Sequence, residues 1–98
     1  MERIIFESYV IDVLMPDLVG HDRRTAAFVV YLFLLRQSSR RRGTISVSLQ
    51  SIATKTGLSK SSVQGAIGHL KRRGLLDPAV KATVTNPLRR VLRPWIEG

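Results

Sequence analysis

The apolar positions of the stretch SKSSVQGAIGHLKRRG recur at the spacing of a helix. Four of them fall at i, i+3, i+4 and i+7 and so share one face: Val63, Ala66, Ile67 and Leu70. The opposite face carries small and polar side chains. The pattern therefore predicts an amphipathic helix that Ser59 caps and that ends at Gly74.

Two glycines lie on the outward side of this predicted helix. Gly65 and Gly68 each cost about 1 kcal/mol of helix stability relative to alanine. Two explanations remain open. Either the bare backbone allows a close approach to a partner, or the helix is poorly stabilised and is held by its packing.

A shorter helix is predicted directly before this one. Its apolar positions at i, i+3 and i+4 are Leu49, Ile52 and Ala53. Ser48 is expected to cap it, and Gly57 has the position of a glycine that ends a helix. Only a three-residue turn then separates the two helices. Before them, the β-branched stretch 44–47 predicts a small strand.

Another helix is predicted earlier in the chain, from Arg23 to about Ser38, with Asp22 as its N-cap. Residues 26–35 are apolar on every side, which requires burial on nearly all faces. Two explanations again remain open. The helix is the spine of the core, or its surplus apolar surface forms a homodimer interface together with the N-terminal segment.

Both ends of the chain predict extended structure. Residues 4–14 are rich in β-branched and aromatic side chains and predict an extended segment or a short strand. Residues 75–93 predict two short strands joined by a turn at Asn86-Pro87. Trp95 is expected to pack on the core rather than to contact a partner.

The predicted order is therefore helix, small strand, helix, short turn, helix and hairpin. Its middle resembles the winged helix-turn-helix domains of bacterial regulators and of plasmid and phage replication proteins. The resemblance rests on IATKTGLS at residues 52–59, on the spacing V-x-x-A-I-x-x-L from Val63, and on GLL at residues 74–76. It implies an α+β fold, a three-helix winged helix-turn-helix with a small C-terminal β-hairpin wing. Residues 22–98 would form this domain, and residues 1–21 an N-terminal extended arm and dimerisation segment.

Charge divides the chain into two unequal parts. Residues 1–22 hold five acids and one base, a balance of −4. Residues 23–98 hold fifteen bases and two acids, a balance of +13. Such an excess of positive charge indicates a polyanionic partner, most often a nucleic acid.

The resemblance implies that the second helix of the pair enters the major groove of double-stranded DNA. Together with the outward face of that helix, it gives these candidate contact residues: Lys60, Ser61, Ser62, Gln64, Gly65, Gly68, His69 and Arg72. Gln64 can present its amide to adenine, whereas Arg72 is expected to meet phosphate. Contacts to the DNA backbone are expected from the wing and from a basic loop: Arg40, Arg41, Arg42, Lys81, Arg89, Arg90 and Arg93.

Enzymatic functions have little support in the sequence. The chain has no cysteine, and His21 and His69 have no companions at metal-ligand spacing. It has no P-loop or dinucleotide fingerprint. We therefore expect no catalysis, no metal and no cofactor. The longest apolar run, residues 25–35, falls short of the roughly 20 residues that span a bilayer, so we expect a cytoplasmic protein without membrane contact.

The leading hypothesis is a homodimeric bacterial transcriptional regulator that reads a specific DNA sequence. The alternatives are a plasmid or phage replication or partition protein, or a winged-helix module that binds protein and does not read DNA. Non-specific binding of RNA or DNA is a weaker third possibility.

Overall fold

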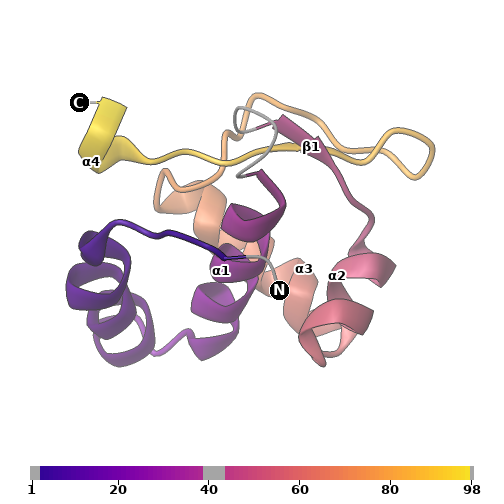
Figure 1. The fold of residues 1–98 in the computed structure, drawn as a ribbon. Helices are drawn as coiled ribbons and strands as arrows, with labels where there is room; N and C mark the ends of the chain where they lie inside the picture. The colour runs from indigo at the N-terminus through magenta and orange to yellow at the C-terminus, as the bar shows by residue number, and fades with distance from the viewer. Residues whose placement is uncertain (1–2, 39–43, 98) are drawn as a thin grey trace.

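Helix α1 (Thr25–Ser38) forms the centre of the fold, and the other elements pack around it (Figure 1). The computed structural model describes residues 3–38 and 44–97. Two helical turns, η1 (Val10–Leu14) and η2 (Pro16–His21), precede α1. Strand β1 (Thr44–Ser46), helices α2 (Leu49–Thr56) and α3 (Lys60–Arg72), strand β2 (Leu88–Arg90) and helix α4 (Pro94–Glu97) follow it. The predicted α+β class is confirmed.

The apolar surface of α1 is covered within the single chain. Every side chain between Ala26 and Leu35 is buried or partly buried, including Tyr31 and Leu34, which are fully buried. Helices η2, α2 and α3 and strand β1 all contact α1. The first of the two explanations for its composition therefore holds, and α1 is the spine of the core. In the described part of the chain, no helix is long and apolar enough to cross a membrane.

The N-terminal segment is helical over most of its length, so the prediction of an extended arm was wrong. Residues 8–21 form wide helical turns in which the Met15 N–H donates to the Val10 carbonyl oxygen five residues earlier. Val10, Leu14 and Leu18 stand four residues apart and are buried in the core. Burial of this stripe outweighs the strand preference of the β-branched residues, because strand preference is itself mainly a matter of packing.

Asp22 does not cap α1, contrary to the prediction. Helix α1 begins two residues later than expected, at Thr25, and its first turn uses the Arg24 carbonyl oxygen, which accepts from the N–H of Ala27 at 3.0 Å. Arg23 has a φ of 55°, in the left-handed region, which separates η2 from α1. The Asp22 carboxylate turns instead toward α3.

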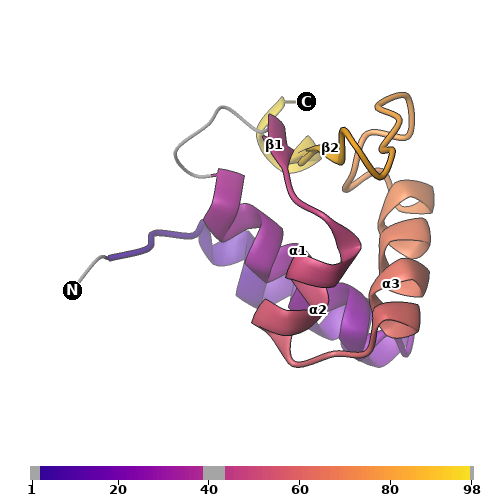
Figure 2. The same ribbon diagram turned by 90° about the vertical axis from the view of Figure 1, so that its right-hand side faces the viewer.

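The sheet pairs β1 with β2 in antiparallel register, with Ile45 opposite Arg89. The expected first strand of the hairpin contributes only a single bridge, between Leu76 and Val91. Residues 77–87 form a long loop, and proline at both position 78 and position 87 removes the N–H groups that a longer ladder would need. In Figure 2 this orange loop and α3 lie on the same side of the molecule.

The two ends of the described chain meet through aromatic side chains. Trp95 stacks on Tyr9 with ring centroids 4.8 Å apart and meets the edge of Tyr31 at 6.4 Å. The Tyr31 hydroxyl donates to the Leu92 carbonyl oxygen at 2.6 Å. Trp95 therefore packs on the core, as expected from the sequence.

Replacing Tyr31 with phenylalanine tests the link between α1 and the C-terminal segment. We predict that Tyr31→Phe lowers the free energy of unfolding by about 1 kcal/mol, because the Leu92 carbonyl loses its donor in a partly buried place. Urea denaturation followed by circular dichroism measures this. Tyr9→Phe is the control, since that residue is 37% exposed and keeps its ring on Trp95. Equal losses in the two variants would contradict the prediction.

Candidate nucleic-acid interface

Helices α2 and α3 form a helix-turn-helix with well-defined ends. The Ser48 Oγ accepts from the Ser51 N–H at 3.0 Å, and the Ser59 Oγ accepts from the Ser62 N–H at 3.1 Å, so both predicted N-caps are confirmed. Gly57 ends α2 with a φ of 80°, a conformation that glycine adopts at little cost. The turn between the helices is thus fixed by local hydrogen bonds and one left-handed residue.

Helix α3 is held to the domain by one apolar face. Val63 and Leu70 are fully buried, and Ala66 and Ile67 nearly so. The helix packs against α1 and α2. Six of the predicted contact residues are exposed on its other sides: Lys60, Ser61, Ser62, Gln64, Gly65 and Arg72. The structure therefore places most of the predicted contact set on one accessible surface.

The two glycines of α3 differ in their surroundings. A Cβ on Gly65 would meet no atom within 4 Å, so nothing in the fold requires glycine there. A Cβ on Gly68 would lie 3.5 Å from the Arg72 guanidinium, which covers the backbone at that position. The bare backbone of the outward face is therefore centred on Gly65.

His69 lies apart from the exposed face, although the sequence placed it among the contact residues. Its side chain is only 15% exposed, and its Nε2 donates to the Asp22 Oδ2 at 2.7 Å. The junction between η2 and α1 covers this flank of α3. A helical projection of α3 alone does not show which other elements pack on its flanks. For this reason the sequence alone puts His69 among the contact residues.

Asp22 is the centre of a charged network at the C-terminal end of α3. Its side chain is 8% exposed and accepts from the His21 Nδ1 at 2.9 Å and from His69, and it forms an ion pair with the Arg73 Nε at 3.0 Å. Arg73 also pairs with Asp17. The hydrogen bonds from His21 and His69, with the nearby Arg73 charge, lower the pKa of the Asp22 carboxyl despite its partial burial. The group is thus ionised at neutral pH.

The same cluster places three side chains of metal-ligand type close together. Atoms of Asp17, His21 and Asp22 lie within 4.8 Å of one another. The side chains of Arg73 and His69 already bind these two carboxylates. We therefore assign the cluster to ion pairing between the N-terminal helices and α3.

The predicted bases of the wing fall into two groups. Lys81 and Arg90 are exposed. Arg89 is buried, and its Nε donates to the Val47 carbonyl oxygen at 3.1 Å. Burial also lowers the pKa of Arg89. Arg93 pairs with Glu7 at 2.7 Å. Three of these four predicted contact residues, Lys81, Arg90 and Arg93, are therefore at the surface, although Arg93 also pairs with Glu7, and Arg89 is buried.

The predicted basic loop, Arg40, Arg41 and Arg42, lies outside the described residues. Alternation along a strand could have revealed the inward position of Arg89, since its neighbours in β2 are less buried. No local pattern could have paired Arg93 with Glu7, which lies 86 residues earlier in the sequence.

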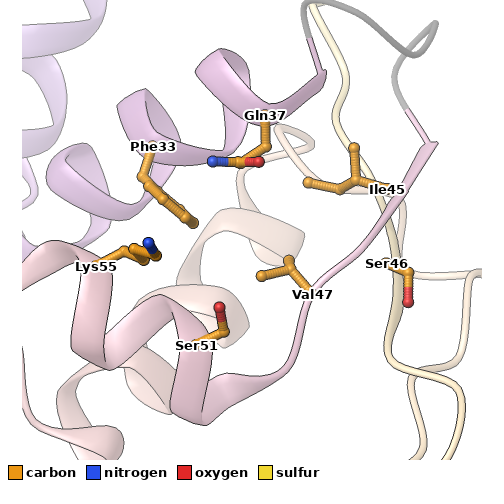
Figure 3. A pocket seen from close by; sticks show the side chains of 7 residues that line it. All are labelled: Phe33, Gln37, Ile45, Ser46, Val47, Ser51 and Lys55. Carbon is orange, nitrogen blue, oxygen red and sulfur yellow. The ribbon is translucent and has the colours of Figure 1, made fainter.

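A hollow of about 330 Å³ lies between α1, β1 and α2, and Figure 3 shows it from close by. Its lining residues are Phe33, Gln37, Ile45, Ser46, Val47, Ser51 and Lys55. Ile45 and Val47 point into it, whereas the Ser46 side chain points away. None of these residues belongs to α3, so the hollow is separate from the exposed surface of that helix.

A family model described as a helix-turn-helix domain matches residues 24–76, more than half of the chain. The chain therefore belongs to the helix-turn-helix family, whose class of function is DNA binding. The match runs from the residue before α1 to the bridge residue Leu76. No curated protein and no solved structure matches the chain significantly.

Substitution of Gly65 tests whether the fold needs a glycine there. We predict that Gly65→Ala raises the free energy of unfolding by about 1 kcal/mol, because alanine is the better helix former and its methyl meets open space. Thermal and urea denaturation measure the change. Gly57→Ala is the matched control and should destabilise by about 1 kcal/mol, because its φ is left-handed. A loss of stability in Gly65→Ala would show that the fold requires this glycine.

Proposed function

We propose that this protein binds double-stranded DNA in a sequence-specific way and regulates transcription. The observation that carries the proposal is the exposed N-terminal half of α3, which projects polar side chains on the side of the helix opposite its buried apolar face. The major groove admits a helix of this kind.

The side chains on this half of α3 suit the reading of base edges. Gln64 can form two hydrogen bonds with adenine, and Ser61 can reach a base or a phosphate. Lys60, at the first position of the helix, suits a phosphate contact. The absence of a side chain at Gly65 would let the backbone approach the bases closely, which gives a reason for a residue that weakens the helix.

Phosphate contacts supply the sequence-independent part of the affinity in this proposal. Arg72, Lys81 and Arg90 are exposed bases on α3, the following loop and β2. They belong to the segment whose balance of charge is +13. Such a surface attracts DNA at a rate and affinity that depend on salt. A role in plasmid or phage replication or partition would use the same surface. Neither role requires a catalytic activity, and we propose none.

We further propose that the protein acts as a homodimer through its N-terminal segment. Four large apolar side chains of residues 4–15 are 39–45% exposed: Ile4, Ile11, Val13 and Met15. Ile5 is 92% exposed. This segment belongs to residues 1–22, whose balance of charge is −4. Two copies can therefore meet there while their basic surfaces stay apart. Because α1 is covered within one chain, the proposed interface does not include it.

Titration of selected DNA tests the main proposal. A duplex obtained by in vitro selection should bind with a log–log salt slope of about −0.9 per neutralised phosphate, several units in all. Gln64→Ala should weaken this binding by about 10- to 100-fold through the loss of a base contact. Arg72→Ala should reduce the slope by about 1. Fluorescence anisotropy measures both.

The control for Gln64 is Gln50→Ala, an exposed glutamine on α2 that bonds Thr54 within its own helix. A flat salt slope, or no binding at low salt, would rule out DNA as the partner. Gly65→Ala adds a second readout, since a methyl group at a close approach should weaken specific binding while the free protein gains stability.

The oligomeric state tests the proposed dimer. The wild type should sediment as a dimer, and the double substitution of Ile11 and Met15 to aspartate should give monomers that remain folded. Val84→Asp is the control, because that residue is 99% exposed on the loop after α3. A monomeric wild type, or dimers in every variant, would contradict this interface. Under the dimer hypothesis, the selected DNA should also be palindromic.

A further inference from the structure

We infer that Asp22 is a positioning residue for DNA recognition, because its carboxylate holds the C-terminal turn of α3 and so sets the orientation of Gln64 and Gly65. The inference rests on the proposed DNA binding. It concerns a residue outside the helix-turn-helix itself, at the junction between η2 and α1.

Asp22 is rigidly held by its own backbone. Its N–H donates to the Asp17 carbonyl oxygen at 2.8 Å, and the N–H of Arg24 donates to the Leu18 carbonyl oxygen at 2.8 Å. Leu18 is fully buried in the core. A side chain anchored in this way can fix the position of whatever it binds.

The two groups that Asp22 binds at the end of α3 are one helical turn apart. His69 lies in the last turns of α3 and Arg73 follows its final residue, at the spacing i, i+4. Both reach the same carboxylate oxygen, at 2.7 and 3.0 Å. A hydrogen bond from His69 and an ion pair from Arg73, both on one side of the helix, resist its rotation and its sliding along the axis.

The apolar face of α3 does not supply this constraint by itself. Burial of Val63, Ile67 and Leu70 holds the helix against α1 and α2, but apolar attraction is not directional. The hydrogen bond from His69 to Asp22 adds the direction. Because Gln64 lies five residues before His69 on the same rigid helix, a small rotation at His69 moves the Gln64 amide relative to the bases.

The network also determines where the DNA surface ends. His69 and Arg73 bind Asp22 and Asp17, although Arg73 is still 36% exposed, and the neighbouring Arg72 is exposed as well. The carboxylates of η2 and the η2–α1 junction thus mark the edge of the basic face. Two other effects of Asp22 would give different results in the test below. One is repulsion of phosphate by its charge, and the other is a contribution to stability alone.

The test is Asp22→Asn in the full chain, with the selected duplex and a scrambled duplex of equal length. We expect the selected duplex to bind about 10-fold more weakly and the scrambled duplex to bind within 2-fold of wild type, at an unchanged salt slope. Asp12→Asn is the charge control, since it removes the same charge from an exposed position of η1. Because Asp12 lies in the segment proposed to form the dimer, sedimentation is used to compare its dimer content with that of the wild type, and at equal dimer content it should change neither affinity.

A second pair of variants removes the contact from the side of α3. His69→Ala should lose specificity as Asp22→Asn does, and His69→Gln, which keeps a donor, should recover part of it. The double variant Asp22→Asn/His69→Ala should lose no more than Asp22→Asn alone, because Asp22→Asn already weakens the contact that His69→Ala removes. Binding is measured well below the melting temperature of each variant.

Each outcome decides the inference. Tighter binding of both duplexes by Asp22→Asn would indicate charge repulsion and overturn positioning. A lower melting temperature with unchanged specificity would indicate a purely structural role and overturn it as well. If the wild type binds no duplex, the proposed function itself fails. This result differs from failure of the inference, which is judged by comparing the variants with a wild type that binds.

Discussion

The rest of the structure depends on the burial of α1. A helix that is apolar on every side can exist in water only if every side is covered, and a three-helix domain offers two helices and a small sheet for the purpose. Here η1 and η2 supply the remaining cover through Val10, Leu14 and Leu18. The N-terminal segment is therefore part of the folded domain.

That cover brings acidic side chains next to a basic domain. Glu7, Asp17 and Asp22 each pair with a base from the later part of the chain. The pairs give Arg93, Arg73 and His69 partners within the chain. Each of these pairs therefore joins the acidic N-terminal segment to the basic later part of the chain.

Local patterns predicted the parts of the fold that are stabilised locally. The apolar spacing of α2 and α3, the serine caps and the glycine turn all involve residues within a few positions of one another, and the sequence placed them correctly.

The site was predicted less completely. Asp22 and His69 are 47 residues apart in the sequence and Asp17 and Arg73 are 56 apart, so no periodicity reveals their contact. The helical form of residues 8–21 depends on α1 as a packing partner, which the segment's own β-branched composition conceals.

The two glycines of α3 illustrate how the fold narrows a question that the sequence raises. The sequence made Gly65 and Gly68 equivalent, since both lie opposite the buried face. The structure separates them, because the Arg72 guanidinium covers Gly68 and nothing covers Gly65. A methyl group at position 65 would cost the free protein nothing and would strengthen the helix. A glycine that the fold does not need, at the centre of the exposed face of α3, is best explained by what approaches that face.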